Sequence, residues 1–243
     1  MSAARTIPER DPYLTIPRFE RIPWLVHGFG TRRWTLEDFR AKKEWPHVFV
    51  AWLDQVHSNT IRFIARPFRI RPKADALATD RPGIILAVKT ADCLPVLLVD
   101  ESRRIIAAVH SGWRGTEQRI VERAVRGLRE RYGSHPETLL AALGPCIAAD
   151  CYDVGPEVKE RFRAAGLPTD IFRPSGQPGK YVLDLRQANR LQLERLELDP
   201  KNIFDVGACT HCDDRFHSYR RDRNKPARLW NFIGIRDRGQ IST

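Results

Sequence analysis

Three apolar runs in the middle of the chain constrain its fold more than any other feature. Residues 83–88, 95–99 and 105–109 are nearly all apolar, and each run has the length of a strand. Strands with this pattern are buried on both faces, so their sheet needs a covering layer on each side. The pattern predicts a mixed α/β fold with a central mixed sheet flanked by helices, built as a single domain over residues 1–243.

Shorter elements are expected on both sides of these runs. A helix with one apolar stripe is expected at 117–132, with Thr116 as its cap and Gly133 at its end. Further helices are expected at 35–43, 156–165 and 183–196, and further strands at 48–53, 61–65, 138–143, 203–208 and 228–235. Prolines limit regular structure near the start, so residues 1–30 are expected to form a loop and edge segment, with 1–26 extended or loop.

The sequence shows no sign of a membrane protein or of export. It contains no run of about 18 apolar residues, which a membrane-spanning helix would need. Charged residues interrupt the first thirty positions, where a signal peptide would have an apolar core. The chain has five cysteines, an odd number that argues against a disulfide framework and for reduced thiols. These features together predict a cytoplasmic protein.

The chain is basic, with a formal net charge of +11. Most of the basic residues are arginines, and they are spread along the whole sequence with acidic residues between them. Nucleic-acid-binding proteins concentrate such residues in a stripe or tail, so this dispersion favours an anionic small molecule or a solvated surface. A nucleic-acid-binding module stays an alternative that depends on the charge alone.

Two histidines and a cysteine follow or end predicted strands, and together they suggest a metal site. His57, Cys93 and His110 would supply two imidazoles and a thiolate, a three-ligand zinc set that leaves a fourth position open. Asp75 and Asp92 are available to orient these ligands. The same residues also fit a metal-free hydrolase, in which Cys93 is the nucleophile and His110 its base, or they are separate structural residues.

The remaining cysteines give a weaker signal. Cys209 and Cys212 form a C-x-x-C pair, which can be half of a zinc site or a redox dithiol. A four-cysteine zinc site would need a second close pair, and Cys146 and Cys151 are too far apart in sequence for the usual ligand spacing. The favoured interpretation is structural cysteines near the site.

Four arginines beside glycines or aromatic residues suggest an anion site. They are Arg32, Arg114, Arg220 and Arg221. A guanidinium group can hold a phosphate or carboxylate with two hydrogen bonds, although a surface ion pair is the commoner role for an arginine. The sequence has no Walker loop and no dinucleotide-binding fingerprint, which disfavours an ATPase or a Rossmann enzyme.

These motifs resemble those of the YfiH family, which has also been described as laccase-domain or multicopper polyphenol oxidase proteins. The resemblance runs in the family order from about residue 27 to the C-terminus, through residues 55–58, 74–76, 79–83, 90–96, 109–115, 143–147, 151–155 and 216–221. The sequence departs from the family where residues 28–32 run directly into 33–35 without a glycine-rich loop, and where Ala227-Arg228 replaces Gly-Arg.

The resemblance implies a single α/β domain with one zinc ion on His57, Cys93 and His110, where copper could also bind. It implies a purine nucleoside phosphorylase, a glycosyltransferase that cleaves adenosine, inosine and methylthioadenosine with phosphate, and adenosine deaminase as a side activity. The partners would be the nucleoside and phosphate, without a membrane. Alternatives are a Cys/His hydrolase or amidase that edits peptidoglycan precursors, as some relatives are described, and a polyphenol oxidase with bound copper.

The candidate residues can be assigned roles in that chemistry. His57, Cys93 and His110 would be catalytic as metal ligands. Arg32 and Arg114 are expected to contact substrate or phosphate, and Arg220 and Arg221 are further candidates. Gln55, Asp75 and Asp92 are expected to support the ligands or recognise the base.

Overall fold

Two large β-sheets packed face to face form the middle of the molecule. The structure is a computed structural model that describes residues 11–42, 48–223 and 227–236. Its strands are β1 (Tyr13–Leu14), β2 (Leu25–Gly30), β3 (Phe49–Trp52), β4 (Ile61–Phe63), β5 (Ala76–Thr79), β6 (Ile84–Thr90), β7 (Leu94–Asp100), β8 (Ile105–Ser111), β9 (Leu140–Leu143), β10 (Asp153–Val154), β11 (Phe172–Pro174), β12 (Tyr181–Leu183), β13 (Ile203–Asp205) and β14 (Leu229–Ile235).

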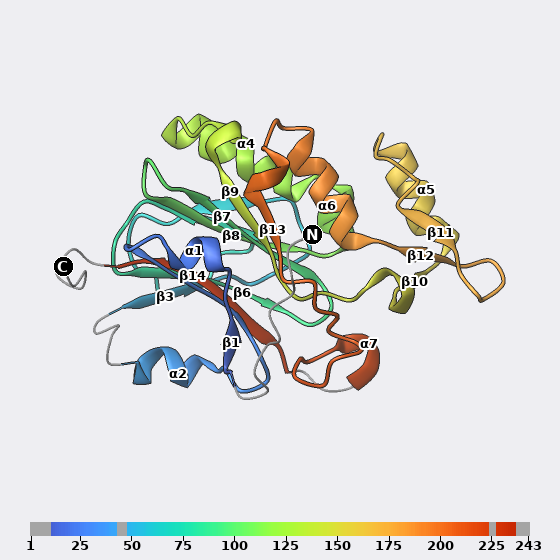
Figure 1. The fold of residues 1–243 in the computed structure, drawn as a ribbon, viewed down its shortest axis with the longest axis horizontal. Helices are drawn as coiled ribbons and strands as arrows, with labels where there is room; N and C mark the ends of the chain where they lie inside the picture. Colours follow the sequence, from blue (N-terminus) through green and yellow to red (C-terminus); the bar gives the residue numbers. More distant parts are fainter. Residues whose placement is uncertain (1–10, 43–47, 224–226, 237–243) are drawn as a thin grey trace.

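The helices are short and lie outside the sheets. They are α1 (Pro17–Glu20), α2 (Leu36–Ala41), α3 (Trp113–Glu117), α4 (Ile120–Tyr132), α5 (Pro156–Ala164), α6 (Leu185–Glu194) and α7 (Tyr219–Asp222), with 3₁₀ turns η1 (Pro136–Thr138), η2 (Ala149–Cys151) and η3 (Pro200–Asn202). The α4 and α6 helices cover one side of the paired sheets and α2 covers the other (Figure 1).

Within the described residues, the strands are divided among three sheets. The first sheet has the order β1-β2-β14-β6-β3, and the second has the order β13-β9-β7-β8-β5-β4. Both are mixed. In the first, β3 pairs with β6 in parallel and β14 pairs with β6 antiparallel. In the second, β13 pairs with β9 in parallel and β7 pairs with β9 antiparallel. A small third sheet, β10-β12-β11, lies beside α5 at one end of the molecule (Figure 1). The mixed α/β class is confirmed, but two packed sheets replace the one central sheet that was expected.

The apolar runs are buried on both faces, as their composition predicts. In β6, Leu86 and Val88 face the second sheet, whereas Ile85 and Ala87 pack toward α2. Every residue of β7 and β8 is buried. Because burying one large aliphatic side chain stabilises the folded state by about 1.5–3 kcal/mol, these central strands hold the two layers together.

The long helix expected at 117–132 is broken in two. The α3 helix ends at Glu117, Arg119 adopts a left-handed conformation with a φ of 60°, and α4 begins at Ile120. Thr116 lies inside α3 and does not cap α4, because its hydroxyl donates to the carbonyl of Gly112. The Arg119 guanidinium donates to the carbonyl of Ala165 and so supports the break. The end at Gly133 is confirmed, since this glycine caps α4 with a φ of 71°.

The N-terminal part differs most from expectation. Within residues 11–26 the structure contains the helical turn α1, which begins at a proline, and the first residues of β2. Strand β2 is not at an edge, because it lies between β1 and β14 and all six of its residues are buried. Residues 1–10 and position 43, where the predicted α2 helix would end, lie outside the described residues.

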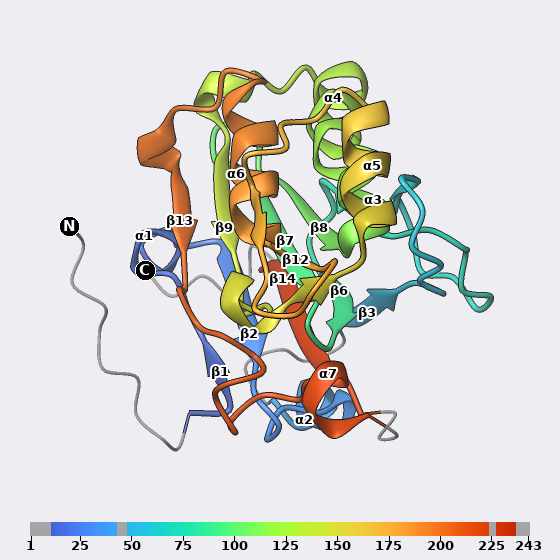
Figure 2. The same ribbon diagram turned by 90° about the vertical axis from the view of Figure 1, so that its right-hand side faces the viewer.

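The ends of the central strands position the candidate site. The β3 strand leads into the loop that carries residue 57, the bend between β6 and β7 carries residue 93, and residue 110 is the last but one of β8. Figure 2 shows α7 below these strands and the α5 segment above them. No helix among the described residues is long and apolar enough to cross a membrane.

Candidate active site

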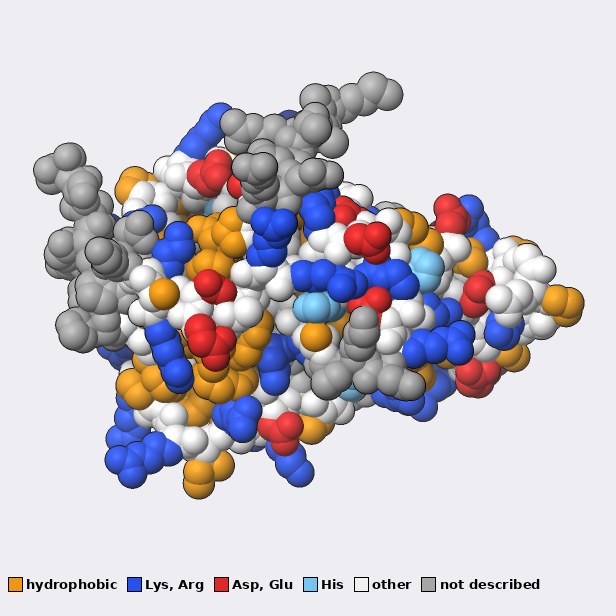
Figure 3. Space-filling model, turned by 90° about the horizontal axis from the view of Figure 1, so that it is seen from below, with side chains coloured by type: hydrophobic (Ala, Val, Ile, Leu, Met, Phe, Trp, Pro, Cys, Tyr) orange, Lys and Arg blue, Asp and Glu red, His pale blue; other side chains and the backbone are white. Residues whose placement is uncertain are grey.

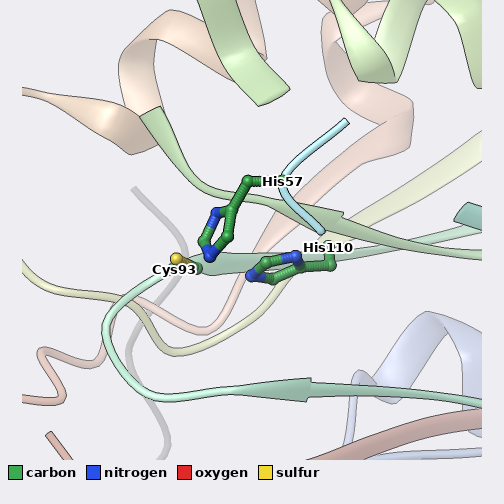
Figure 4. Close-up of side chains that lie close together, drawn as sticks. All are labelled: His57, Cys93 and His110. Atoms are coloured by element: carbon green, nitrogen blue, oxygen red, sulfur yellow. The ribbon is translucent and has the colours of Figure 1, made fainter. Parts of the chain in front are cut away.

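The structure brings His57, Cys93 and His110 together. Their ligand atoms all lie within 4.8 Å of one another, and the centres of the two imidazole rings are 4.8 Å apart. Figure 4 shows the three side chains converging from separate segments. Two backbone positions at the cluster are strained. His57 has a φ of 59° and Asp92, which precedes Cys93, has a φ of 82°, both in the left-handed region.

Asp75 fixes the two histidine-bearing segments from behind. Its fully buried carboxylate lies 2.8 Å from Nδ1 of His110, which leaves Nε2 of that ring free to face the thiol. The same carboxylate accepts hydrogen bonds from the backbone N–H groups of His57, at 3.0 Å, and Ser58, at 2.6 Å. One side chain thus orients His110 and closes the loop that carries His57.

The protonation states of the histidines differ. Burial opposes protonation of His110, but the charge of Cys93 and hydrogen bonds to Asp75 and Cys93 outweigh it and raise the pKa of His110 to about 9. Burial and the neighbouring charge of His110 lower the pKa of His57. Burial works to raise the pKa of Asp75, yet hydrogen bonds from His110 and Ser58 lower it below its usual value. The pocket therefore stabilises the charged form of Asp75 beside His110.

The residues fit a bound metal ion. A Cβ atom added to Gly112 would lie 2.8 Å from Sγ of Cys93 and 3.0 Å from Nδ1 of His57, so only glycine leaves room beside these ligand atoms. Two imidazole nitrogens and one thiolate suit zinc, and copper binds the same ligand types. An ion here would have three protein ligands and an open position toward the cavity.

A cavity of about 590 Å³ opens beside the three ligands. Of the predicted residues, Gln55, His57, Asp92, Cys93, His110, Arg114 and Arg220 line it. Asp75 lies behind the cavity wall. The sequence alone did not indicate Asp54, Arg71, Lys89, Trp113, Tyr152, Tyr219 or Arg228, which also line the cavity.

Gln55 and Asp92 brace the walls of the cavity. The Gln55 amide donates to the carbonyl of Lys89 at 2.8 Å and accepts from its N–H at 2.7 Å, which ties the 55–58 segment to β6. The Asp92 carboxylate accepts from the hydroxyl of Thr210 at 2.7 Å and from the backbone N–H of Arg220 at 2.6 Å. Both polar groups are therefore occupied by the protein itself.

Arg32 and Arg221 do not line the cavity. Arg32 donates to the carbonyl of Phe216 and pairs with Asp222 at 2.8 Å. Arg221 donates to the carbonyls of Thr210 and His211, at 2.9 and 2.8 Å. These two arginines hold the loop of residues 209–222 in place instead of reaching the three ligands.

Five cationic side chains line the cavity, and none of them pairs with a carboxylate in the described part of the chain. They are Arg71, Lys89, Arg114, Arg220 and Arg228. Burial, followed by the charges of Arg71 and Arg228, lowers the pKa of Lys89. Lys89 could have been found from the sequence because it directly follows an apolar run, and Arg228 because it belongs to the Ala227-Arg228 motif, whereas Arg71 stands in a loop without a motif.

Aromatic rings form part of the same walls. The Arg114 guanidinium lies 4.4 Å from the centre of the Trp113 ring, and Arg220 lies 5.3 Å from that of Tyr152. Such stacking holds each guanidinium group in place without neutralising it, because a ring carries no net charge. The cavity thus combines fixed cations, aromatic faces and a candidate metal site.

Residues 34–236 match the family model described as multi-copper polyphenol oxidoreductase laccase. The chain belongs to this family. Proteins named YfiH and YlmD are among its relatives, which confirms the expected YfiH resemblance. The matched segment contains all three candidate ligands and every cation that lines the cavity.

Several relatives carry the names of purine enzymes. The chain is 41% identical to the purine nucleoside phosphorylase of Deinococcus radiodurans over 185 residues, which cover 76% of this chain and 70% of the relative. It is 36% identical to the purine nucleoside phosphorylase YfiH of Escherichia coli K12, over 76% of this chain and 73% of that protein. It is 41% identical to adenosine deaminase RL5, from an unknown prokaryotic organism, over 60% of this chain and 56% of RL5.

Solved structures show the same fold. YfiH of Bacillus licheniformis has a TM-score of 0.83 and 27% identity, covering 93% of this chain and 98% of that one. YlmD of Geobacillus stearothermophilus has a TM-score of 0.82 and 28% identity, covering 93% of this chain and 100% of that one.

Proposed function

We propose that this protein is a zinc-dependent purine nucleoside phosphorylase with adenosine deaminase as a side activity. Its substrates would be adenosine, inosine and methylthioadenosine with phosphate, and its products the free base and the (methylthio)ribose 1-phosphate. The observation that carries the proposal is the set of five cations without carboxylate partners beside His57, Cys93 and His110. The names of the relatives support the same enzyme class.

The reaction explains why the cavity is cationic. In phosphorolysis a phosphate oxygen forms a bond to C1′ of the sugar while the C1′–N9 bond breaks. The electron pair of the broken bond leaves with the purine, which takes up a proton. Phosphate must be stripped of water and held against C1′, which guanidinium groups do with paired hydrogen bonds. Arg114 and Arg220 are the residues best placed for this, since aromatic stacking already fixes both.

The aromatic walls suit the other half of the substrate. Trp113, Tyr152 and Tyr219 line the cavity and offer ring faces on which a purine can stack. Stacking leaves the edges of the base free, which is compatible with a site that takes both adenosine and inosine. The nucleoside would then lie between the rings and the cations.

His57, Cys93 and His110 would hold the metal, with Asp75 keeping His110 in the required orientation. Bound zinc supplies Lewis-acid chemistry, which draws electron density from an oxygen atom that enters its open position. The protein's own contribution is a rigid ligand set, because the buried carboxylate and the glycine at 112 fix its shape before any ion binds.

Product analysis with adenosine tests the proposal directly. The zinc-loaded protein is incubated with adenosine in the presence and absence of phosphate, and the products are separated by chromatography. Adenine that forms only with phosphate is the expected result, and Cys93→Ser should lose both this activity and one bound zinc ion. If the zinc-loaded protein forms no adenine with phosphate present, the proposal is wrong.

The same experiment separates two further functions. Inosine that forms without phosphate would identify deamination, the activity named for RL5, as the main reaction. A metal-free hydrolase is the second candidate, favoured by the hydrogen bond between Cys93 and His110 that raises the pKa of the histidine. In that case a chelator would remove the metal and leave a Cys93-dependent activity intact.

A further inference from the structure

A second group of thiols and an imidazole gathers outside the cavity. The ligand atoms of Cys151, His211 and Cys212 lie within 4.8 Å of one another, and the two sulfur atoms are 3.1 Å apart. None of the three lines the cavity described above. Cys212 is exposed and the other two are partly exposed, so an ion from solvent can reach them.

The surrounding backbone holds these groups in place without an ion. Cys146 and Cys209 face each other in a short parallel bridge, in which the N–H of Thr210 donates to the carbonyl of Cys146 at 3.1 Å. The thiol of Cys209 accepts from the N–H of Ala148 at 3.3 Å. These contacts join the segment before Cys151 to the C-x-x-C loop, so the ligands meet because of the fold.

The ligand types select the class of ion. Thiolates with an imidazole suit zinc and other thiophilic ions, and a C-x-x-C pair has the spacing found in structural zinc sites. The thiol of Cys209 is not one of the three ligand atoms that lie within 4.8 Å of one another. It is hydrogen-bonded to the thiols of Cys151 and Cys212, so a small movement would make it the fourth ligand. A four-cysteine zinc site would need a second cysteine pair close in sequence, which this chain lacks. Here Cys151, from a segment 61 residues before Cys212, takes the place of that pair.

We propose that Cys151, Cys209, His211 and Cys212 bind a second zinc ion with a structural role. The ion would clamp two segments that form one wall of the cavity. Cys151 precedes Tyr152, and the 209–212 loop is tied through Arg221 to α7, which carries Arg220. Because the Arg220 guanidinium lies against the Tyr152 ring, fixing both segments fixes that contact.

Zinc stoichiometry in four proteins tests this site. Wild type, Cys93→Ser, Cys212→Ser and the double variant are freed of metal, reloaded with zinc under reducing conditions and analysed by elemental mass spectrometry. The expected contents are about two, one, one and no zinc ions per chain. Cys146→Ala is the matched control and should match wild type, because this buried thiol is not among the proposed ligands.

Each site can fail independently of the other. One zinc ion in wild type and in Cys93→Ser but none in Cys212→Ser would support the second site and remove the first. Equal zinc contents in wild type and Cys212→Ser, or no zinc in a folded Cys93→Ser protein, would overturn the second site. A Cys151–Cys212 disulfide that persists in reductant and excess zinc, seen as a mass loss of two hydrogens, would also overturn it.

Cobalt(II) gives a readout that does not depend on the Cys212 variant. In Cys93→Ser the catalytic thiol is gone, so a sulfur-to-cobalt charge-transfer band can come only from the second site. The band is expected in Cys93→Ser and absent from the double variant. A Cys93→Ser protein without the band would contradict the proposal.

Discussion

At the scale of single residues, the site depends on one buried carboxylate and one missing side chain. Asp75 holds His110 and the loop of His57, and Gly112 leaves the space beside Cys93 empty. Neither residue would touch a metal ion, yet together they set where its ligands stand.

Gly112→Ala should weaken zinc binding to His57, Cys93 and His110 while leaving the fold intact. Gly112 has a φ of −79°, which any residue adopts, so the backbone tolerates alanine. The added Cβ would lie 2.8 Å from Sγ of Cys93, and the thiol must move away from the histidines. We expect about a 100-fold or greater loss of zinc affinity, measured by competition with a chromogenic chelator.

Gly176→Ala is the matched control, because a Cβ added there meets no atom within 4 Å. It should bind zinc as wild type does. An unchanged zinc affinity in Gly112→Ala would show that zinc binding does not need the space that glycine leaves beside Cys93 and His57.

The clustering of His57, Cys93 and His110 was easier to expect than the rest of the cavity lining, because their residue types form a known zinc-ligand set and each follows or ends a predicted strand. Arg32 carries a recognisable motif, but it pairs with Asp222, 190 positions away, and such a long-range contact leaves no trace in a local pattern. Arg71 was missed because no local pattern marks it as a cavity residue.

At the scale of elements, those marked by a local sequence pattern were predicted, and those set by long-range contacts were missed. The β6, β7 and β8 strands follow from their apolar runs, whereas the break between α3 and α4 is held by long-range contacts: the side chains of Asn189 and Gln192 donate to Thr116, and Arg119 donates to the carbonyl of Ala165. Strand β2 was misjudged because its prolines lie before it and its partner β14 comes from the other end of the chain.

Strand β2 also carries a pH-sensitive contact. Nε2 of the buried His27 accepts a hydrogen bond from the N–H of Ile16 at 2.8 Å, and burial lowers the pKa of His27 to about 4. Between about pH 6.5 and 4 the His27 imidazole is protonated in the unfolded chain but not in the folded one. The free energy of unfolding therefore falls as the pH falls. From pH 7 to pH 5 this one residue should lower the free energy of unfolding by about 2 kcal/mol.

The measurement is urea denaturation of wild type and His27→Gln at both pH values. Glutamine can still accept the bond from Ile16 but does not titrate, so the variant should lose less stability than wild type on acidification. Equal losses in the two proteins would show that His27 stays uncharged in the unfolded chain or becomes charged in the folded one.

At the scale of the whole molecule, basic side chains are widespread, but those on the surface and those in the cavity differ in whether they form ion pairs. Basic side chains are interspersed with acidic ones over the face shown in Figure 3, and this dispersion does not form the single stripe typical of nucleic-acid-binding proteins. Many arginines are paired, as Arg163 is with Glu160, whereas the cations that line the cavity pair with no carboxylate among residues 11–42, 48–223 and 227–236.

Removing one unpaired cation should therefore weaken phosphate binding. For Arg114→Gln we expect the KM for phosphate to rise about 10-fold, which corresponds to about 1.4 kcal/mol, with a smaller change in the KM for adenosine. Arg163→Gln removes an exposed, paired arginine outside the cavity and should leave both values unchanged. Steady-state kinetics over a range of phosphate concentrations would check this, and equal effects of the two substitutions would contradict it.

The central position of β14 has a consequence for synthesis of the chain. This strand is formed by Leu229–Ile235, yet it fills the gap between β2 and β6. While the chain emerges from the ribosome, the facing edges of those two strands stay unpaired until residue 235 has been made. A premature stop codon before residue 229 would leave both edges open, and such edges pair readily with other chains. Its product would accumulate as aggregate and would not survive as a shortened enzyme.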